Sequence, residues 1–198
     1  SKRGSVGFHE DPDIFEIKQY NGYSQLARVY RDNKVADYAY RPDNLRHAKS
    51  VNSATTTHLW DGASIVGDIA GNTTTWYNRG MGLLSYERGS EKRFYLHNAH
   101  GDVVQLCDTA GNIAKSYEFD AFGVEKDKDD ADPNPFRYCG EYYDRETDTI
   151  YLRARYYNPR LGRFGGEDPA NDGINWYTYC DNNPIIYVDP TGLLSYVF

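Results

Sequence analysis

The feature that most constrains the fold of this chain is a turn signal that recurs behind aromatic residues. The aromatic anchors are about twenty residues apart, at Tyr40, Trp60, Tyr77, Tyr95 and Tyr117. Asp or Asn and then Gly often follow an anchor, as in Trp60-Asp61-Gly62. Asp or Asn begins a turn by bonding its own backbone, and Gly supplies the positive φ that closes the turn. The pattern therefore predicts β-hairpins that stack side by side to bury their aromatic faces.

Composition favours the same all-β fold class. The 198 residues include 19 Tyr, 8 Phe, 3 Trp and 18 Gly, and no long segment carries apolar residues at helical spacing. The longest apolar runs are too short to cross a bilayer, so we expect no membrane span. We therefore predict antiparallel hairpins that form part of a larger sheet.

Charge and cysteine content limit the kinds of partner and cofactor that we expect for this chain. A net charge of −7, from 22 basic and 29 acidic residues, disfavours binding to nucleic acid, which needs clustered Lys and Arg. Cys107, Cys139 and Cys180 are widely spaced and predict buried or half-buried thiols. His97 and His100 share a predicted turn without a visible third ligand, so we expect neither a metal nor another cofactor.

Two local patterns divide the second half of the chain. The segment from Glu125 to Pro135 is dense in Asp and lacks the ligand order of an EF-hand, so it predicts a solvated loop and a domain boundary rather than a calcium site. From Thr149 to Tyr157 apolar and polar residues alternate, which predicts one strand with Arg153 and Arg155 on the same face.

Short motifs crowd the region from Tyr151 to Leu193. They are Tyr151-Leu152-Arg153-Ala154-Arg155-Tyr156-Tyr157-Asn158-Pro159, Gly162-Arg163-Phe164, Glu167-Asp168-Pro169, Asn175-x-Tyr177-x-Tyr179, Asn182-Asn183-Pro184 and Asp189-Pro190-x-Gly192-Leu193. In this order they resemble the Rhs/YD-repeat family, and residues 136–193 resemble its Rhs-associated core segment. The upstream anchors are similar to YD repeats.

This resemblance implies a fold and a setting. Members of the family wind YD repeats into a spiral β-sheet that closes as a hollow shell, and an inward-curling core segment plugs one end. The implied divisions are YD-repeat strands over 1–124, an acidic loop over 125–135, a core plug over 136–193 and a short remainder over 194–198. The implied partners are a C-terminal toxin and the remaining shell repeats, within a longer protein that is secreted or displayed on the cell surface. Open sheet edges also favour self-association.

The resemblance further implies that the core segment cleaves its own chain, here between Leu193 and Leu194. The matching catalytic pair is Asp168 and Asp189. In a confined pair of carboxylates one stays protonated, so one group can activate water while the other protonates the leaving amide. Arg155 and Arg163 are candidates to hold a carboxylate or to stabilise the oxyanion. The motif residues expected to shape the site are Tyr156, Tyr157, Gly162, Asn183, Pro184, Pro190 and Gly192.

Other interpretations of the same residues remain open. Each Asp-Pro pair also fits a simple turn initiator. The core segment would then be a catalytically silent plug. The tyrosine-rich faces would suit an adhesive or carbohydrate-binding module, because aromatic rings stack on sugars, although tyrosines packed between strands explain them equally. If the chain is an enzyme, we expect only cleavage of itself and no turnover of external substrates.

Overall fold

The computed structural model describes residues 6–8, 16–170 and 175–197 and divides into two compact units, residues 1–75 and 76–198. In the hydrogen-bonded order, the first twelve strands follow the chain from β1 to β12. The first unit contains β1 (Val6–Phe8), β2 (Glu16–Tyr20), β3 (Leu26–Arg31), β4 (Lys34–Tyr40), β5 (Arg46–Val51), β6 (Ala54–Asp61), β7 (Ser64–Ala70) and the start of β8 (Thr73–Arg79). Consecutive strands from β1 to β7 pair antiparallel, so the predicted fold class is confirmed.

The aromatic anchors of the first unit lie where the strand register shifts. A bulge or irregularity occurs at the anchors Tyr40 and Trp60, each at or near the end of its strand. The same irregularity occurs at Tyr20, an aromatic residue one repeat earlier that the sequence analysis did not include and that we count as an anchor from here on. The Tyr40 hydroxyl donates to the Leu26 carbonyl at 2.8 Å, and the Trp60 ring N–H donates to the Arg46 carbonyl at the same distance. Leu26 and Arg46 are the residues paired with Tyr20 and Tyr40, so each anchor bonds to the partner of the anchor before it.

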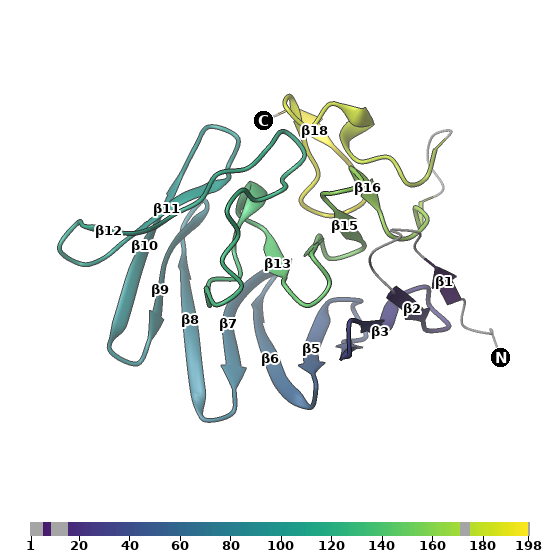
Figure 1. The fold of residues 1–198 in the computed structure, drawn as a ribbon, viewed down its shortest axis with the longest axis horizontal. Coiled ribbons are helices and arrows are strands. Elements are labelled where there is room, and N and C mark those ends of the chain that lie inside the picture. The colour runs from purple at the N-terminus through teal and green to yellow at the C-terminus, as the bar shows by residue number, and fades with distance from the viewer. Residues whose placement is uncertain (1–5, 9–15, 171–174, 198) are drawn as a thin grey trace. The chain divides into compact units, whose positions relative to one another are not determined.

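The second unit continues the hairpins and adds a region of short strands. Its first strands are β9 (Leu83–Arg88), β10 (Glu91–His97), β11 (Val103–Cys107) and β12 (Ile113–Ser116). A second sheet then contains β13 (Tyr142–Asp144), β14 (Thr149–Tyr151), β15 (Tyr156–Asn158) and β16 (Arg163–Phe164), and a third contains β17 (Tyr187–Val188) and β18 (Tyr196–Val197). Two 3₁₀ turns, η1 (Tyr138–Gly140) and η2 (Cys180–Asn182), complete it (Figure 1).

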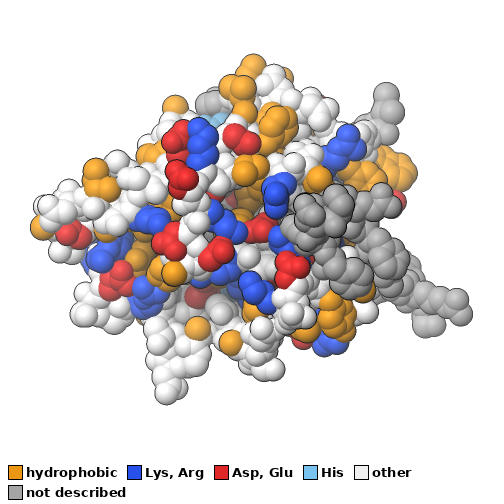
Figure 2. All heavy atoms as spheres, in the orientation of Figure 1, with side chains coloured by type: hydrophobic (Ala, Val, Ile, Leu, Met, Phe, Trp, Pro, Cys, Tyr) orange, Lys and Arg blue, Asp and Glu red, His pale blue; other side chains and the backbone are white. Residues whose placement is uncertain are grey.

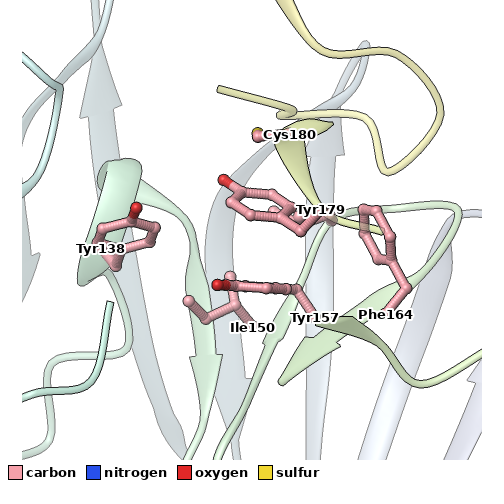
Figure 3. Close-up of a cluster of buried hydrophobic side chains, with 7 residues drawn as sticks. Tyr138, Ile150, Tyr157, Phe164, Tyr179 and Cys180 are labelled. Carbon is pink, nitrogen blue, oxygen red and sulfur yellow. The ribbon is translucent and has the colours of Figure 1, made fainter. Parts of the chain in front are cut away.

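The core of the second unit is built largely from tyrosine. Its buried residues are Tyr138, Ile150, Leu152, Tyr157, Phe164, Tyr179 and Cys180 (Figure 3). The rings of Tyr157 and Tyr179 stack with centroids 3.9 Å apart, and Phe164 meets both at steep angles. Buried tyrosines keep their hydroxyls bonded, since Tyr138 donates to the Ala121 carbonyl and Tyr157 to the Phe122 carbonyl. These bonds attach the core to the Ala121–Phe122 turn.

The acidic segment 125–135 is only partly the solvated loop that its composition predicts. Residues 126–131 are exposed, but Asp132 and Asn134 are buried. The Tyr117 hydroxyl donates to Asp132 at 2.6 Å, and the Arg137 guanidinium pairs with both Glu125 and Asp132. The prediction missed this because the buried acids are compensated by Arg137, which follows the segment in sequence.

The predicted single strand from Thr149 to Tyr157 is also wrong. The chain forms β14, reverses through residues 152–155, and returns as β15 antiparallel to β14. Arg153 has a φ of 63°, and the Ala154 N–H donates to the Leu152 carbonyl. The sequence does not reveal this turn for two reasons. Apolar and polar residues alternate on both sides of it, and the residue in the left-handed position is Arg rather than Gly or Asn, which are the usual turn signals.

The surface of the molecule mixes charges of both signs. Figure 2 shows Lys and Arg side chains interspersed with Asp and Glu on the face in view. Ion pairs account for part of this mixture, among them Lys128 with Asp130 and Asp148, and Lys115 with Asp129. Within the described ranges, no helix has the length and apolar character needed to cross a membrane.

Candidate functional site

The predicted aspartate pair lies around one buried guanidinium. An Nη2 atom of Arg155 is 3.5 Å from Oδ2 of Asp168 and 3.9 Å from Oδ2 of Asp189. All three side chains are buried, with at most 8% of each exposed. The two Asp-Pro motifs, which are separated in sequence, therefore present their carboxylates to the same cation.

Each aspartate uses its other oxygen to cap the turn that it begins. Oδ1 of Asp168 accepts the Ala170 N–H at 2.8 Å. Oδ1 of Asp189 accepts the N–H groups of Thr191, Gly192 and Leu193 at 3.2, 2.8 and 3.2 Å, and the Thr191 hydroxyl at 3.1 Å. Each aspartate can therefore begin a turn and also face Arg155, because Oδ1 accepts the turn N–H groups while Oδ2 lies near the guanidinium.

The turn at residues 153–155 donates hydrogen bonds to the segment that precedes the predicted cleavage site. Arg153 Nη1 donates to the Pro190 carbonyl at 2.7 Å, the Ala154 N–H donates to the Thr191 carbonyl at 3.0 Å, and Arg155 Nε donates to the Gly192 carbonyl. Three consecutive residues thus hold three consecutive carbonyls, an arrangement that we call the 153–155 clamp. It leads directly to Leu193.

Gly192 fits the clamp because it has no side chain. Its φ is +72°, and a Cβ atom built there would lie 2.8 Å from the Leu152 carbonyl oxygen and 2.9 Å from the Arg155 nitrogen. Both neighbours are backbone atoms, which cannot rotate away. The Asp-Pro-x-Gly motif thus combines a capping carboxylate with a residue that permits close approach of two chain segments.

Burial shapes the electrostatics of the clamp. Desolvation lowers the pKa of Arg155, and the charges of Asp168 and Asp189 only partly oppose it. The Arg155 guanidinium also lies 3.6 Å from the centre of the Phe164 ring, a cation–π contact that favours the charged form. Burial raises the pKa of Glu141, and its ion pair with Arg153 works against that rise. The clamp is therefore held by charges that compensate one another within the core.

The other predicted site residues occupy different positions. Leu193 and Leu194 are 44% and 69% exposed, so the residues on both sides of the predicted cleavage site lie at the surface. Arg163 is exposed on β16, and among the described contacts none joins its side chain to either aspartate. Arg153 and Glu141, which sequence reasoning did not include, take part instead. The sequence offers little indication of this ion pair, because Glu141 and Arg153 come together only when the chain reverses at residues 152–155.

The predicted motif residues support the core around the site. Tyr156 and Tyr157 are buried in β15, Pro184 is buried, and Pro190 is the first residue of the clamped segment. Gly162 has a φ of 62° in the turn between β15 and β16. Asn183 follows η2, and its carbonyl accepts the N–H groups of Ile186 and Tyr187.

The two histidines of the 97–100 turn have separate surroundings. The His97 ring lies 3.1 Å from the Leu83 carbonyl, whereas His100 Nδ1 lies 2.9 Å from Asp102 Oδ1. Cys139 joins the second contact, with its Sγ 3.7 Å from His100 Nδ1. All three cysteines are free thiols, and they are buried or half-buried as predicted.

Comparison with known proteins agrees with this architecture. The model of the teneurin YD-shell family matches residues 19–185. A tRNA3(Ser)-specific nuclease WapA from Bacillus spizizenii is 39% identical over 84% of this chain and 8% of its own length. Double-stranded DNA deaminase toxin A from Burkholderia cenocepacia is 35% identical over 85% of this chain and 11% of its own. The crystal structure of TcdB2-TccC3 without its hypervariable C-terminal region matches 90% of this chain and 10% of that one, with a TM-score of 0.73 at 23% identity.

Antiparallel hairpins in chain order, followed by a tyrosine-rich core segment, define a YD-repeat shell protein. The chain belongs to the teneurin YD-shell family, which the match over residues 19–185 shows directly. It spans about a tenth or less of the relatives described above.

Proposed function

We propose that this chain is part of a shell that encloses a toxin, and that its core segment cleaves the chain between Leu193 and Leu194. The relatives support the first part, because two proteins with different activities in their names, a tRNA nuclease and a DNA deaminase, share this same region. A common shell with an exchangeable active domain accounts for that combination. In this interpretation the toxin is the partner of the shell, and the whole protein acts outside the cell that makes it.

The observation that carries the second part is the approach of Asp168 and Asp189 to Arg155 beside the clamped 190–192 segment. In the proposed reaction, water attacks the Leu193 carbonyl carbon and one carboxylate accepts a proton from that water. The bond from this carbon to the Leu194 nitrogen then breaks, and the nitrogen takes up a proton from the other carboxyl group. No cofactor takes part. Because the clamp holds the preceding three carbonyls, the peptide link is already oriented by folding.

The position of Arg155 determines which role we assign to each residue of the site. The Arg155 Nη2 atom lies beside a carboxylate oxygen of each aspartate, 3.5 Å from Asp168 and 3.9 Å from Asp189. Arg155 Nε already donates to the Gly192 carbonyl, one residue before the carbonyl under attack. We therefore assign Arg155 the stabilisation of the developing oxyanion, and we assign Asp189, which contacts the Leu193 N–H, the position nearest the reacting bond.

Mass spectrometry of the purified chain tests the proposal. The wild-type chain is expected to lose residues 194–198 at a rate independent of protein concentration, as an intramolecular reaction requires. Asp189→Asn and Asp168→Asn are expected to slow this loss at least about a hundredfold, because the amide cannot exchange a proton. Asp181→Asn is the matched control, since Asp181 is an exposed aspartate of the same segment. A wild-type chain that stays intact would overturn self-cleavage.

The second candidate function is a catalytically silent plug, and the capping of Asp189 favours it. Four donors converge on one carboxylate oxygen, which is the pattern of a structural turn. In that case the wild-type chain and Asp189→Asn would both stay intact in the mass spectrum. The substitution would lower only the stability of the core. The same samples therefore separate the two functions.

A further inference from the structure

A second chemical cluster lies away from the aspartate pair. Nδ1 of His100, a carboxylate oxygen of Asp102 and Sγ of Cys139 all lie within 4.8 Å of one another. The proposed aspartate chemistry uses none of these atoms. Nitrogen, oxygen and sulfur donors in one cluster form the ligand set that Zn²⁺ and similar divalent ions accept.

We propose that His100, Asp102 and Cys139 form a binding site for a divalent transition-metal ion of the Zn²⁺ class. Zinc binds nitrogen and oxygen at about 2.0–2.2 Å and thiolate sulfur at about 2.3 Å, so tetrahedral ligand atoms lie roughly 3–4 Å apart. The distance from His100 Nδ1 to Cys139 Sγ is 3.7 Å, which fits this spacing. The distance from His100 Nδ1 to Asp102 Oδ1 is 2.9 Å, so this pair has to move apart by only a few tenths of an ångström.

The ligands are held in place by their own hydrogen bonds. Asp102 Oδ1 accepts the Cys139 backbone N–H at 2.8 Å, and Oδ2 accepts an amide N–H of Asn98 at 2.8 Å. Cys139 Sγ is also 3.8 Å from the Tyr179 hydroxyl, whose ring lies in the core cluster (Figure 3). Contacts of this kind orient ligands before the metal arrives.

The cluster has an opening for a further ligand. A pocket lined by His100, Asp102, Tyr138 and Pro184 adjoins the cluster. Three protein ligands with one open position are typical of zinc sites that bind water or another small ligand. Binding replaces the proton between His100 and Asp102 and releases the thiol proton of Cys139. The metal would join the turn after β10 to η1, two segments far apart in sequence.

Titration of the purified chain with Zn²⁺ against a chromophoric chelator tests this site. We expect one Zn²⁺ per chain, with affinity lowered at least about tenfold by Cys139→Ser. Cys107→Ser is the matched control, because Cys107 is a half-buried thiol that is not part of the cluster. Equal affinity of wild type and Cys139→Ser would overturn the proposal.

Replacement of zinc by Co²⁺ supplies an independent readout from the wild-type chain. A thiolate-to-cobalt charge-transfer band is expected in wild type and in Cys107→Ser, and it should be absent from Cys139→Ser. His100→Gln provides a second ligand variant if circular dichroism shows that Cys139→Ser is unfolded. A wild-type Co²⁺ spectrum without thiolate charge transfer would exclude Cys139 as a ligand.

Discussion

At the residue scale, the candidate cleavage site depends on contacts that single atoms make possible. The 153–155 clamp needs a backbone that approaches Gly192 closely, and it needs Arg155 to serve two aspartates and one carbonyl together. Asp168, Asp189 and Arg155 could be named from motifs, whereas the contribution of Arg153 could not. Its role follows from a left-handed backbone conformation in the middle of an alternating run.

Substitution of Gly192 tests the clamp directly. Gly192→Ala adds a Cβ less than 3 Å from two backbone atoms at a φ of +72°, so overpacking and backbone strain combine. We expect a loss of about 2–4 kcal/mol in the free energy of unfolding of the second unit. Gly89→Ala is the control, since Gly89 has a φ of +60° with no atom within 4 Å of the added Cβ, and a loss of about 1 kcal/mol is expected. Denaturant titration measures both, and equal losses would contradict the close approach.

At the element scale, the repeat is defined by how one hairpin bonds to the next. The bulges at Tyr20, Tyr40 and Trp60, with the bonds from Tyr40 and Trp60 to the partner of the preceding anchor, explain why aromatic residues recur about every twenty positions. The sequence spacing predicted the hairpins correctly. It did not predict the bulges. A bulge adds only one residue to a strand, and here it lies next to a turn, where the alternation of side chains ends in any case.

Three neighbouring strands also share a buried polar chain. Arg46 of β5 donates its Nε–H to His58 Nε2 at 3.1 Å, and His58 Nδ1 lies 2.6 Å from Asp68 of β7. Nε2 must therefore carry a lone pair, which places the ring proton on Nδ1 and directs it to Asp68. Burial, and then the charge of Arg46, lower the pKa of His58, and Asp68 only partly opposes this. Geometry and electrostatics thus agree on a neutral imidazole.

This neutral histidine predicts an acid sensitivity of the first unit. Because the folded pKa is below the unfolded value of about 6.5, the unfolded chain binds the extra proton first. The free energy of unfolding should therefore fall as pH drops below about 6.5, by up to about 1.4 kcal/mol per pH unit. His58→Gln should remove this slope, whereas His47→Gln, at an exposed position, should keep it. Denaturant titrations followed by Trp fluorescence check the prediction, and an unchanged slope in His58→Gln would contradict it.

At the scale of the whole molecule, the chain matches only part of the length of each relative, and its large sheet ends in an edge strand. It spans about a tenth or less of its relatives, and β12 is the last strand in the hydrogen-bonded order of its sheet. A strand at such a position offers backbone groups to another strand. Ile113 of β12 is 59% exposed, so an apolar side chain accompanies those groups.

We therefore expect the isolated chain to self-associate through β12. Ile113→Lys should shift sedimentation toward the monomer, because charged side chains on an edge strand oppose pairing between chains. Ile185→Lys is the matched control, since Ile185 is 65% exposed but lies outside the strands. Equal sedimentation of both variants and the wild type, at several protein concentrations, would rule out this edge as the contact.

The sequence alone determined the class of the fold and the motifs of the core segment, because turn chemistry and strand alternation act over a few residues. Anchors at Tyr40 and Trp60, the Asp-Pro turns and the half-buried thiols could all be predicted at that range. Only the tertiary structure decided which distant groups meet: Arg155 with Asp168 and Asp189, Asp132 with Tyr117 and Arg137, and His100 with Cys139. These contacts depend on chain reversals and on the compensation of buried charge, and both are properties of the packed core.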